Sequence, residues 1–245
     1  MPEEYALSKE IILSGESCAY LPESDTVVLS DLHLGFELAM EEKGLFLPRL
    51  QVRIELERMG VIIERYRPST IVVNGDLKHD FSRNSPQEWV EIKKLFEFLS
   101  SKTKVVVVKG NHDNYILNIA SKFNIETLPY YLAGDILLAH GDVEIEGFSN
   151  QWTIIGHEHP AIRVRDAIGA QYKFPVFLYL KRSGILVLPA FSPFSLGTDV
   201  LTESREFMSP YLRNIEEADA FIFAIDKGQV RKLGSLSDIR SAALQ

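Results

Sequence analysis

Cysteine is nearly absent from this chain: Cys18 is the only one among 245 residues, which excludes an internal disulfide. Long apolar runs are also missing, since the longest stretches, such as residues 105–108 and 220–225, fall far short of the roughly 20 residues that a membrane-spanning helix needs. The start, MPEEYALSKE, lacks the basic segment and apolar run of a signal peptide. We therefore expect a cytoplasmic protein that does not enter a membrane.

A surplus of positive charge is missing too. The chain has 26 lysines and arginines against 34 aspartates and glutamates, a formal net charge of −8. This balance argues against broad electrostatic binding to a nucleic-acid backbone, although bound divalent cations would offset part of the negative charge where a substrate arrives. With 46% hydrophobic residues and no repeat or linker, residues 1–245 are expected to form a single domain.

Strands alternate with helices in the first half of the chain. Three β-branched runs that end in Gly, Asn or Asp predict buried strands at residues 26–31, 70–76 and 104–111. A helix is expected at about residues 47–66, where apolar residues are interleaved with Arg and Glu before Pro68. Residues 85–100 begin with a serine, a proline and Glu88 in the pattern of a capping box. The pattern predicts two consecutive β-α-β units.

The second half of the chain has a different pattern. Residues 136–142 and 152–159 are strand-like with no helix between them, and residues 174–180, 184–191 and 220–226 predict hairpin-connected, partly antiparallel strands. A second sheet packed on the first is therefore expected. The fold class is α/β, a four-layer α-β-β-α sandwich of two mixed sheets flanked by helices.

All six histidines lie in or beside short motifs that follow strand-like runs. The motifs are SDLH with His33, GDLKH with His79, GNHD with His112, AHGD with His140, and GHEH with His157 and His159. Imidazoles with carboxylates and an amide oxygen form the mixed nitrogen and oxygen shell that divalent transition metals accept. The histidines therefore indicate metal ligands and catalytic groups, as in a dinuclear metal hydrolase.

Asp31 and His33 stand two residues apart after the first strand. In an extended segment both would point the same way, with Leu32 directed into the core, although D-x-H alone occurs often by chance. Asp76 follows Gly75, which permits a tight turn, and its carboxylate can offer one oxygen to each of two metals. By itself, a Gly-Asp pair is more typical of an ordinary turn.

The later motifs are more specific. Asn111 can coordinate through its side-chain oxygen while His112 faces the substrate, with a turn closed by an Asx hydrogen bond as the alternative. Packing rarely explains His157 and His159 together, because a buried neutral imidazole needs partners for both nitrogens. Glu158 between them is expected to point away from the metals and to have a structural role.

In their order D-x-H, G-D, G-N-H-D, H and G-H-x-H, the motifs resemble the calcineurin-like metallophosphoesterases over roughly residues 27–160. The resemblance implies two divalent metal ions, one held by Asp31, His33, Asp76 and His159, the other by Asp76, Asn111, His140 and His157. Asp76 would be the bridge, and His112 a general acid or a donor to the phosphoryl charge. Manganese is the metal that the resemblance favours, while the ligands also admit iron and zinc.

Such a site predicts in-line attack on phosphorus by a metal-bridging hydroxide. Residues 75–79 are similar to the G-D-L-x-H stretch of SbcD-type nucleases, whereas the G-D-x-x-D-R-G pattern of protein phosphatases is missing. The chain is most similar to small stand-alone SbcD-related phosphoesterases. This favours a phosphodiester substrate, a nucleotide or a short nucleic acid. A phosphomonoesterase with the same metals and a non-catalytic scaffold are the alternatives.

Substrate contacts are less well specified. His79 is expected to contact the substrate or to support His112, or else to be an exposed loop residue. The candidate phosphate-binding side chains are Lys78, Arg163, Arg49 and Arg83, each of which is otherwise an ordinary surface charge. The apolar segment at residues 35–48 is expected to be a packed loop, with a lid or a contact in a homo-oligomer as the alternatives.

Overall fold

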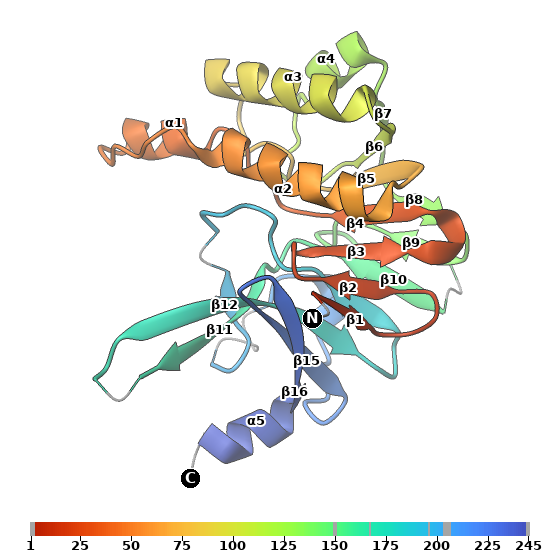
Figure 1. Ribbon diagram of the computed structural model, residues 1–245, viewed down its shortest axis with the longest axis vertical. Helices are drawn as coiled ribbons and strands as arrows, with labels where there is room; N and C mark the ends of the chain where they lie inside the picture. The colour runs from red at the N-terminus through yellow and green to blue at the C-terminus, as the bar shows by residue number, and fades with distance from the viewer. Residues whose placement is uncertain (1–2, 149–150, 167, 196, 203–206, 244–245) are drawn as a thin grey trace.

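The strands are arranged in two sheets. The computed structural model describes residues 3–148, 151–166, 168–195, 197–202 and 207–243. Within these ranges one sheet has seven strands and the other nine, and each contains parallel and antiparallel pairs. The predicted α/β fold of two mixed sheets flanked by helices is confirmed, with α2 and α3 on one side of the molecule and α5 at its opposite end (Figure 1).

The seven-stranded sheet follows chain order in space. Its strands are β1 (Glu4–Ala6), β2 (Ile12–Ser14), β3 (Cys18–Leu21), β4 (Thr26–Leu29), β5 (Thr70–Asn74), β6 (Lys104–Val108) and β7 (Glu126–Leu128). Strands β4 to β7 are parallel. Helices α1 (Phe36–Glu42) and α2 (Gln51–Tyr66) connect β4 to β5, and α3 (Pro86–Ser100) connects β5 to β6. The two predicted β-α-β units are therefore confirmed.

The nine-stranded sheet is built from the rest of the chain. Its strands are β8 (Tyr131–Ala133), β9 (Ile136–Leu138), β10 (Trp152–Ile155), β11 (Pro160–Arg165), β12 (Gln171–Leu180), β13 (Ile185–Val187), β14 (Thr198–Asp199), β15 (Ala220–Asp226) and β16 (Gln229–Ser235). The spatial order is β14-β11-β12-β13-β10-β9-β8, with β15 pairing with β12 and β16. Short helical segments η1 (Pro22–Ser24), α4 (Leu117–Ala120), η2 (Ser121–Phe123) and η4 (Pro210–Leu212) lie between strands.

Side-chain alternation along the parallel strands builds two apolar cores at once. On β4, β5 and β6 the odd-numbered apolar residues pack under α2 and α3, where Met59 and Phe96 are fully buried. The even-numbered residues, such as Val72, face the second sheet. A third core covers the other face of the second sheet and includes Leu236 of α5 (Leu236–Ala243). Three cores therefore separate four layers, as predicted.

Helix α3 begins as its sequence predicts. The Ser85 hydroxyl accepts a hydrogen bond from the Glu88 backbone N–H at 3.2 Å, and the Glu88 carboxylate accepts one from the Ser85 N–H at 2.5 Å. These two bonds close a capping box and satisfy amide groups that have no partner within the helix. The box also brings the Glu88 carboxylate close to the loop that follows β5.

The segment at residues 35–48 is not the packed loop that its composition predicts. It forms helix α1, which begins after Gly35 in a left-handed conformation (φ 91°). The Glu37 carboxylate caps the start of α2 by accepting the Leu50 and Gln51 N–H groups at 2.9 and 2.8 Å. This cap holds the two helix ends together and leaves Phe46, in the connection, 81% exposed. Within the part of the chain that the structure describes, no helix is long and apolar enough to cross a membrane.

Candidate metal centre

The loops after β4, β5, β6, β9 and β10 meet at one place. The Asp31 N–H donates to the Gly75 carbonyl at 3.0 Å, and the His33 N–H donates to the Asp76 carbonyl at 2.9 Å, which joins the loops after β4 and β5. The two sheets are joined by the His157 N–H, which donates to Asp31 Oδ2 at 3.1 Å. Strand ends from both sheets thus supply the side chains of one site.

The backbone at this site is not extended, contrary to the prediction for D-x-H and H-x-H. Asp31, His33, Asp76, His157 and His159 all have left-handed φ values, of 61°, 50°, 50°, 68° and 47°. Each lies just beyond a strand, where the sheet no longer imposes its alternation. A left-handed conformation is uncommon outside glycine and clusters at functional sites. The side chains therefore converge through turns. Leu32, between Asp31 and His33, packs into the core under the helices.

The motif glycines make room for the carboxylates. A Cβ atom added to Gly75 would overlap the His140 ring, and one added to Gly110 would overlap Asp76. Gly75 also needs its positive φ of 91°. Neighbouring side chains thus approach both glycines too closely for a Cβ atom to fit. Gly75 also adopts the tight-turn conformation that the sequence suggests, whereas Gly110 does not have a positive φ.

Asp31, His33 and His159 form a first group of ligand-type atoms. These atoms lie within 4.8 Å of one another. His159 Nε2 is 3.1 Å from Asp31 Oδ1 and 3.2 Å from His33 Nε2. One carboxylate and two imidazoles therefore face a common point.

A second group of the same composition is formed by Asp76, His140 and His157. His140 Nε2 is 3.4 Å from Asp76 Oδ1 and 3.3 Å from His157 Nδ1. The side-chain oxygen of Asn111 lies 3.1 Å from His140 Nε2 and adds an amide oxygen to this group.

Asp76 lies between the two groups. Its Oδ2 is 3.8 Å from His33 Nε2 in the first group, and its Oδ1 is 3.4 Å from His140 Nε2 in the second. The convergence of carboxylate, amide and imidazole donors suits divalent transition metals, because these ions accept mixed oxygen and nitrogen shells. The residues present therefore fit two metal ions that share the Asp76 carboxylate.

The charges of the site are set by burial and by close pairs. Burial alone would raise the pKa of Asp76, but the hydrogen bond and charge of His140 hold it well below the ordinary value. Burial would lower the pKa of His140, but the hydrogen bond and charge of Asp76 raise it to about 10. The pKa of His33 falls to about 3, mainly through burial. At neutral pH His33 is therefore uncharged, the form of imidazole that binds metals.

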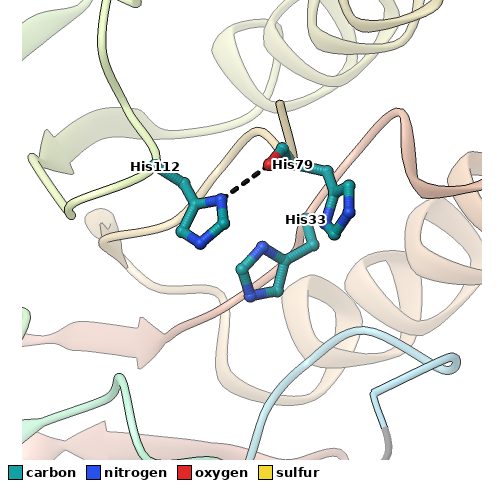
Figure 2. A group of neighbouring side chains, drawn as sticks. All are labelled: His33, His79 and His112. Atoms are coloured by element: carbon teal, nitrogen blue, oxygen red, sulfur yellow. Dashed lines mark hydrogen bonds between the residues drawn. The ribbon is translucent and has the colours of Figure 1, made fainter. Parts of the chain in front are cut away.

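His112 lies beside these groups and is oriented by a backbone carbonyl. Its Nδ1 is 2.6 Å from the carbonyl oxygen of His79, and its ring gathers with those of His79 and His33 (Figure 2). The backbone N–H of His112 donates to Asp76 Oδ1 at 2.9 Å. Because a carbonyl can only accept, Nδ1 carries the proton, and Nε2 is the acceptor in the neutral ring. His79 is half-buried, and its backbone carbonyl, not its imidazole, holds the His112 ring.

The buried carboxylate of Asp113 joins the loops that follow β5 and β6. Asp113 accepts the Leu77, Lys78 and Gly110 N–H groups at 2.9, 3.2 and 2.9 Å. Burial raises its pKa to about 7. Sequence reasoning did not assign a role to Asp113, although its place in GNHD was a visible signal.

Two further supports come from the helices. Glu88 accepts the His79 and Asp80 N–H groups at 3.1 and 2.7 Å. The Gln51 side chain donates to the Leu32 carbonyl at 2.6 Å and to the His33 carbonyl at 3.1 Å. The capping-box pattern predicted the place of Glu88 at the start of α3 but not its contacts with the His79 and Asp80 N–H groups. No sequence pattern indicated a role for Gln51.

The prediction that Lys78 binds a phosphate is wrong. Its side chain is fully buried, and its ammonium group contacts the Asp80 carbonyl and lies 3.6 Å from Glu88 Oε1. A group held in this way is an internal counter-charge and does not reach a substrate. Arg163 is exposed on β11 and is not among the described residues that line the cavity at the histidines.

The two arginines near the site are ion-paired on the surface. Arg49 contacts Glu41, and Arg83 pairs with Asp80 at 2.9 Å and with Glu42 at 2.6 Å. Their charges are therefore partly offset by neighbouring carboxylates.

Glu158 is buried, as a structural residue should be. Its carboxylate accepts the Ser209 N–H at 2.5 Å. This bond ties the histidine loop to the segment before η4.

Several cavities border the site. One, of about 520 Å³, is lined by residues including His33, Asp76, His112, His157 and His159. Another, of about 320 Å³, is lined by residues including Asn111 and His140, and a third, of about 500 Å³, by residues including His159. Asn111 lines both the 520 Å³ and the 320 Å³ cavity, so these two are neighbours at the metal centre.

The comparisons with known proteins agree with this geometry. A family model described as calcineurin-like phosphoesterase matches residues 25–193. The crystal structure of nuclease MPE from Pseudomonas putida is similar, with a TM-score of 0.66 at 18% identity over 91% of this chain and 94% of that one. YfcE, a phosphoesterase from E. coli, aligns with a TM-score of 0.39 at 16% identity over 87% and 93%. No curated protein shows a significant match. At 18% identity the likeness to the nuclease shows a common fold.

Proposed function

Since the chain belongs to the calcineurin-like phosphoesterase family, we propose that it is a metal-dependent phosphodiesterase that acts on a nucleotide or a short nucleic acid. The observation that carries the proposal is the place of Asp76 between two groups of carboxylate and imidazole donors. Two divalent ions on such groups would supply a water of lowered pKa and positive charge beside the phosphoryl oxygens.

The ligand sets follow from the two groups. Asp31, His33, Asp76 and His159 would hold one metal, and Asp76, Asn111, His140 and His157 the other. Manganese is the metal expected from the family resemblance, with iron and zinc compatible with the same donors.

The contacts of His112 support a role as an acid for the leaving group. The His79 carbonyl holds its Nδ1 proton, so Nε2 is the nitrogen that would take up a proton and deliver it to the departing oxygen. His112 lines the 520 Å³ cavity together with Asp76, so the residue borders the space where a phosphate would lie. In its charged form the ring would also stabilise negative charge that develops on the phosphoryl group.

A diester is favoured over a monoester by the two cavities. A diester carries an ester group on each side of phosphorus, and two neighbouring cavities, of about 520 and 320 Å³, border the site. A monoester would need only one. The fold shared with a nuclease is compatible with this preference.

Hydrolysis of bis-p-nitrophenyl phosphate and of p-nitrophenyl phosphate tests the proposal. The protein is stripped with chelator and then reconstituted with Mn²⁺, Fe²⁺ or Zn²⁺. We expect metal-dependent turnover of the diester that exceeds turnover of the monoester and that is lost in Asp76→Asn. Asp135→Asn, in the exposed turn before β9, is the matched control and should behave as the unaltered protein. Faster cleavage of the monoester, or silence on both substrates with two metals bound, would contradict the proposal.

A further inference from the structure

Aromatic rings form a continuous row along the metal centre. The row runs from Phe194 through Phe36, His79 and His112 to Phe81, with successive ring centroids 5.7, 5.1, 5.8 and 6.2 Å apart. These separations are those of interacting aromatic pairs. We call these five residues the aromatic row.

The row is assembled from segments far apart in the sequence. Phe36 is the first residue of α1, Phe81 lies in the loop between β5 and α3, and Phe194 follows β13. The two histidines at its centre lie beside the metal centre, since their ring centroids are 5.5 and 5.0 Å from that of His33. The row therefore runs along the edge of the proposed site, with Phe36 and Phe194 on the His79 side and Phe81 on the His112 side.

Each end of the row opens into one of the two cavities. Phe36 and Phe194 line the 520 Å³ cavity together with Met40 and Met208, whose thioethers also pack well on flat ring systems. Phe81 lines the 320 Å³ cavity and is 57% exposed. Phe81 thus presents ring surface to the cavity next to Asn111 and His140, where an aromatic group of a ligand could stack on it.

The net charge of the chain, −8, gives little support for broad binding to a phosphate backbone. Arg83, two residues after Phe81, is ion-paired with Asp80 and Glu42, whereas Lys109 lines the same cavity as Phe81. Contacts other than a basic groove must then supply much of the affinity for a polyanion. Stacking on aromatic side chains is the sequence-tolerant contact that proteins use for single-stranded nucleic acids.

We propose that the aromatic row binds unpaired nucleobases on the two sides of the scissile phosphate, one base at Phe36 and Phe194 and one at Phe81. The proposal rests on the phosphodiesterase function and adds the substrate class, single-stranded or frayed nucleic acid. In a duplex both faces of a base are covered by its neighbours, whereas an unpaired base can turn a face to a side chain. The row would thus select against paired ends.

The test is the binding of a tetranucleotide that carries 2-aminopurine at one internal position, in the presence of EDTA so that no cleavage occurs. Stacking quenches the fluorescence of this base, and the titration yields Kd. We expect quenching by the unaltered protein and a Kd about tenfold higher for Phe81→Leu and for Phe36→Leu, the range found when one stacking ring is removed. Phe81→Tyr keeps a ring and should restore the binding.

Phe46→Leu is the matched control, because Phe46 is 81% exposed and lies outside the row. Its Kd should equal that of the unaltered protein. The same four nucleotides placed in the stem of a DNA hairpin, where each base is paired, should bind at least about tenfold more weakly. Equal Kd values for Phe81→Leu and Phe46→Leu, or equal affinity for the duplex, would overturn the proposal. Since Phe81 is exposed, its replacement tests the row even if Phe36→Leu fails to fold.

The two proposals fail in different ways. Quenching and ring-dependent binding without hydrolysis of any diester would reject the phosphodiesterase function and retain the aromatic row. Metal-dependent diester hydrolysis with ring-independent binding would retain the function and reject the row. For an active enzyme, kcat/KM on the single strand should fall about tenfold in Phe81→Leu, as binding does.

Discussion

The Nδ1 atom of His112 lies 2.6 Å from the carbonyl oxygen of His79. The bond selects one tautomer of His112 and fixes the direction of its free nitrogen. Glu88 in turn holds the His79 N–H at 3.1 Å, so the start of α3 is linked to the ring of His112 through one loop. This hydrogen bond thus joins two histidines that are 33 positions apart in the sequence.

Replacement of His112 should separate catalysis from metal binding. His112→Ala should lower kcat on a diester by about 10² or more, because an acid and charge-stabilising group is lost. Metal content, measured by elemental analysis of the dialysed protein, should be unchanged. Activity equal to that of the unaltered enzyme would remove His112 from the mechanism.

Replacement of Asp76 should affect both metals. Asp76→Asn weakens a side chain whose two carboxylate oxygens face different groups, so titration calorimetry should show loss of affinity at two sites. Asp135→Asn again serves as the control. If one site kept its affinity while the other was lost, Asp76 would be a ligand of a single metal.

The buried pair of Lys78 and Glu88 should matter for stability. Both side chains are fully buried, and Glu88→Gln leaves the Lys78 ammonium without its counter-charge. We expect the free energy of unfolding in urea to fall by about 3 kcal/mol, as for other broken buried pairs. Glu97→Gln breaks only the exposed pair with Lys93 and should change it by about 0.5 kcal/mol or less. A small effect at Glu88 would show that Lys78 finds another partner.

Glu55 should make the protein less stable as pH rises. Burial raises the pKa of this carboxyl well above 4.5, despite a hydrogen bond from Gln51 at 3.0 Å. A carboxyl that ionises less readily in the folded state gives stability below pH 4.5 that is lost as pH rises towards the folded pKa.

Glu55→Gln should therefore reduce the fall in unfolding free energy that the unaltered protein shows in urea as the pH rises above 4.5. Glu64→Gln, on the exposed side of α2, is the control and should leave the fall unchanged. An identical pH dependence in Glu55→Gln and the unaltered protein would contradict the assignment.

Cys18 should be unreactive in the folded protein. It is fully buried, and burial raises the pKa of its thiol to about 12, so almost no thiolate exists at pH 8. Ellman's reagent should modify no cysteine at pH 8 in buffer and one per chain in guanidinium chloride. Rapid modification of the native protein would show that β3 opens readily.

Much of the fold could be read from the chain because its cues are local. The β-branched runs of β4, β5 and β6 and the capping box at Ser85 act over a few residues and were predicted correctly. The segment at residues 35–48 was misjudged because α1 depends on Glu37, whose carboxylate contacts the start of α2 more than ten positions away. The burial of Lys78 likewise depends on Glu88, a partner on another element.

The sequence by itself determined the chemistry that this protein can hold: the residue types, their order and their places just beyond strands, since donor identity and strand propensity are properties of short segments. Only the tertiary structure decided the geometry. Two sheets must pack before His157 meets Asp31, and left-handed turns replace the expected alternation. The packing also brings Phe194 to Phe36, Phe36 to His79, and Phe81 to His112. Contacts between segments that are far apart in the sequence depend on how the layers pack, and no local sequence pattern encodes that packing.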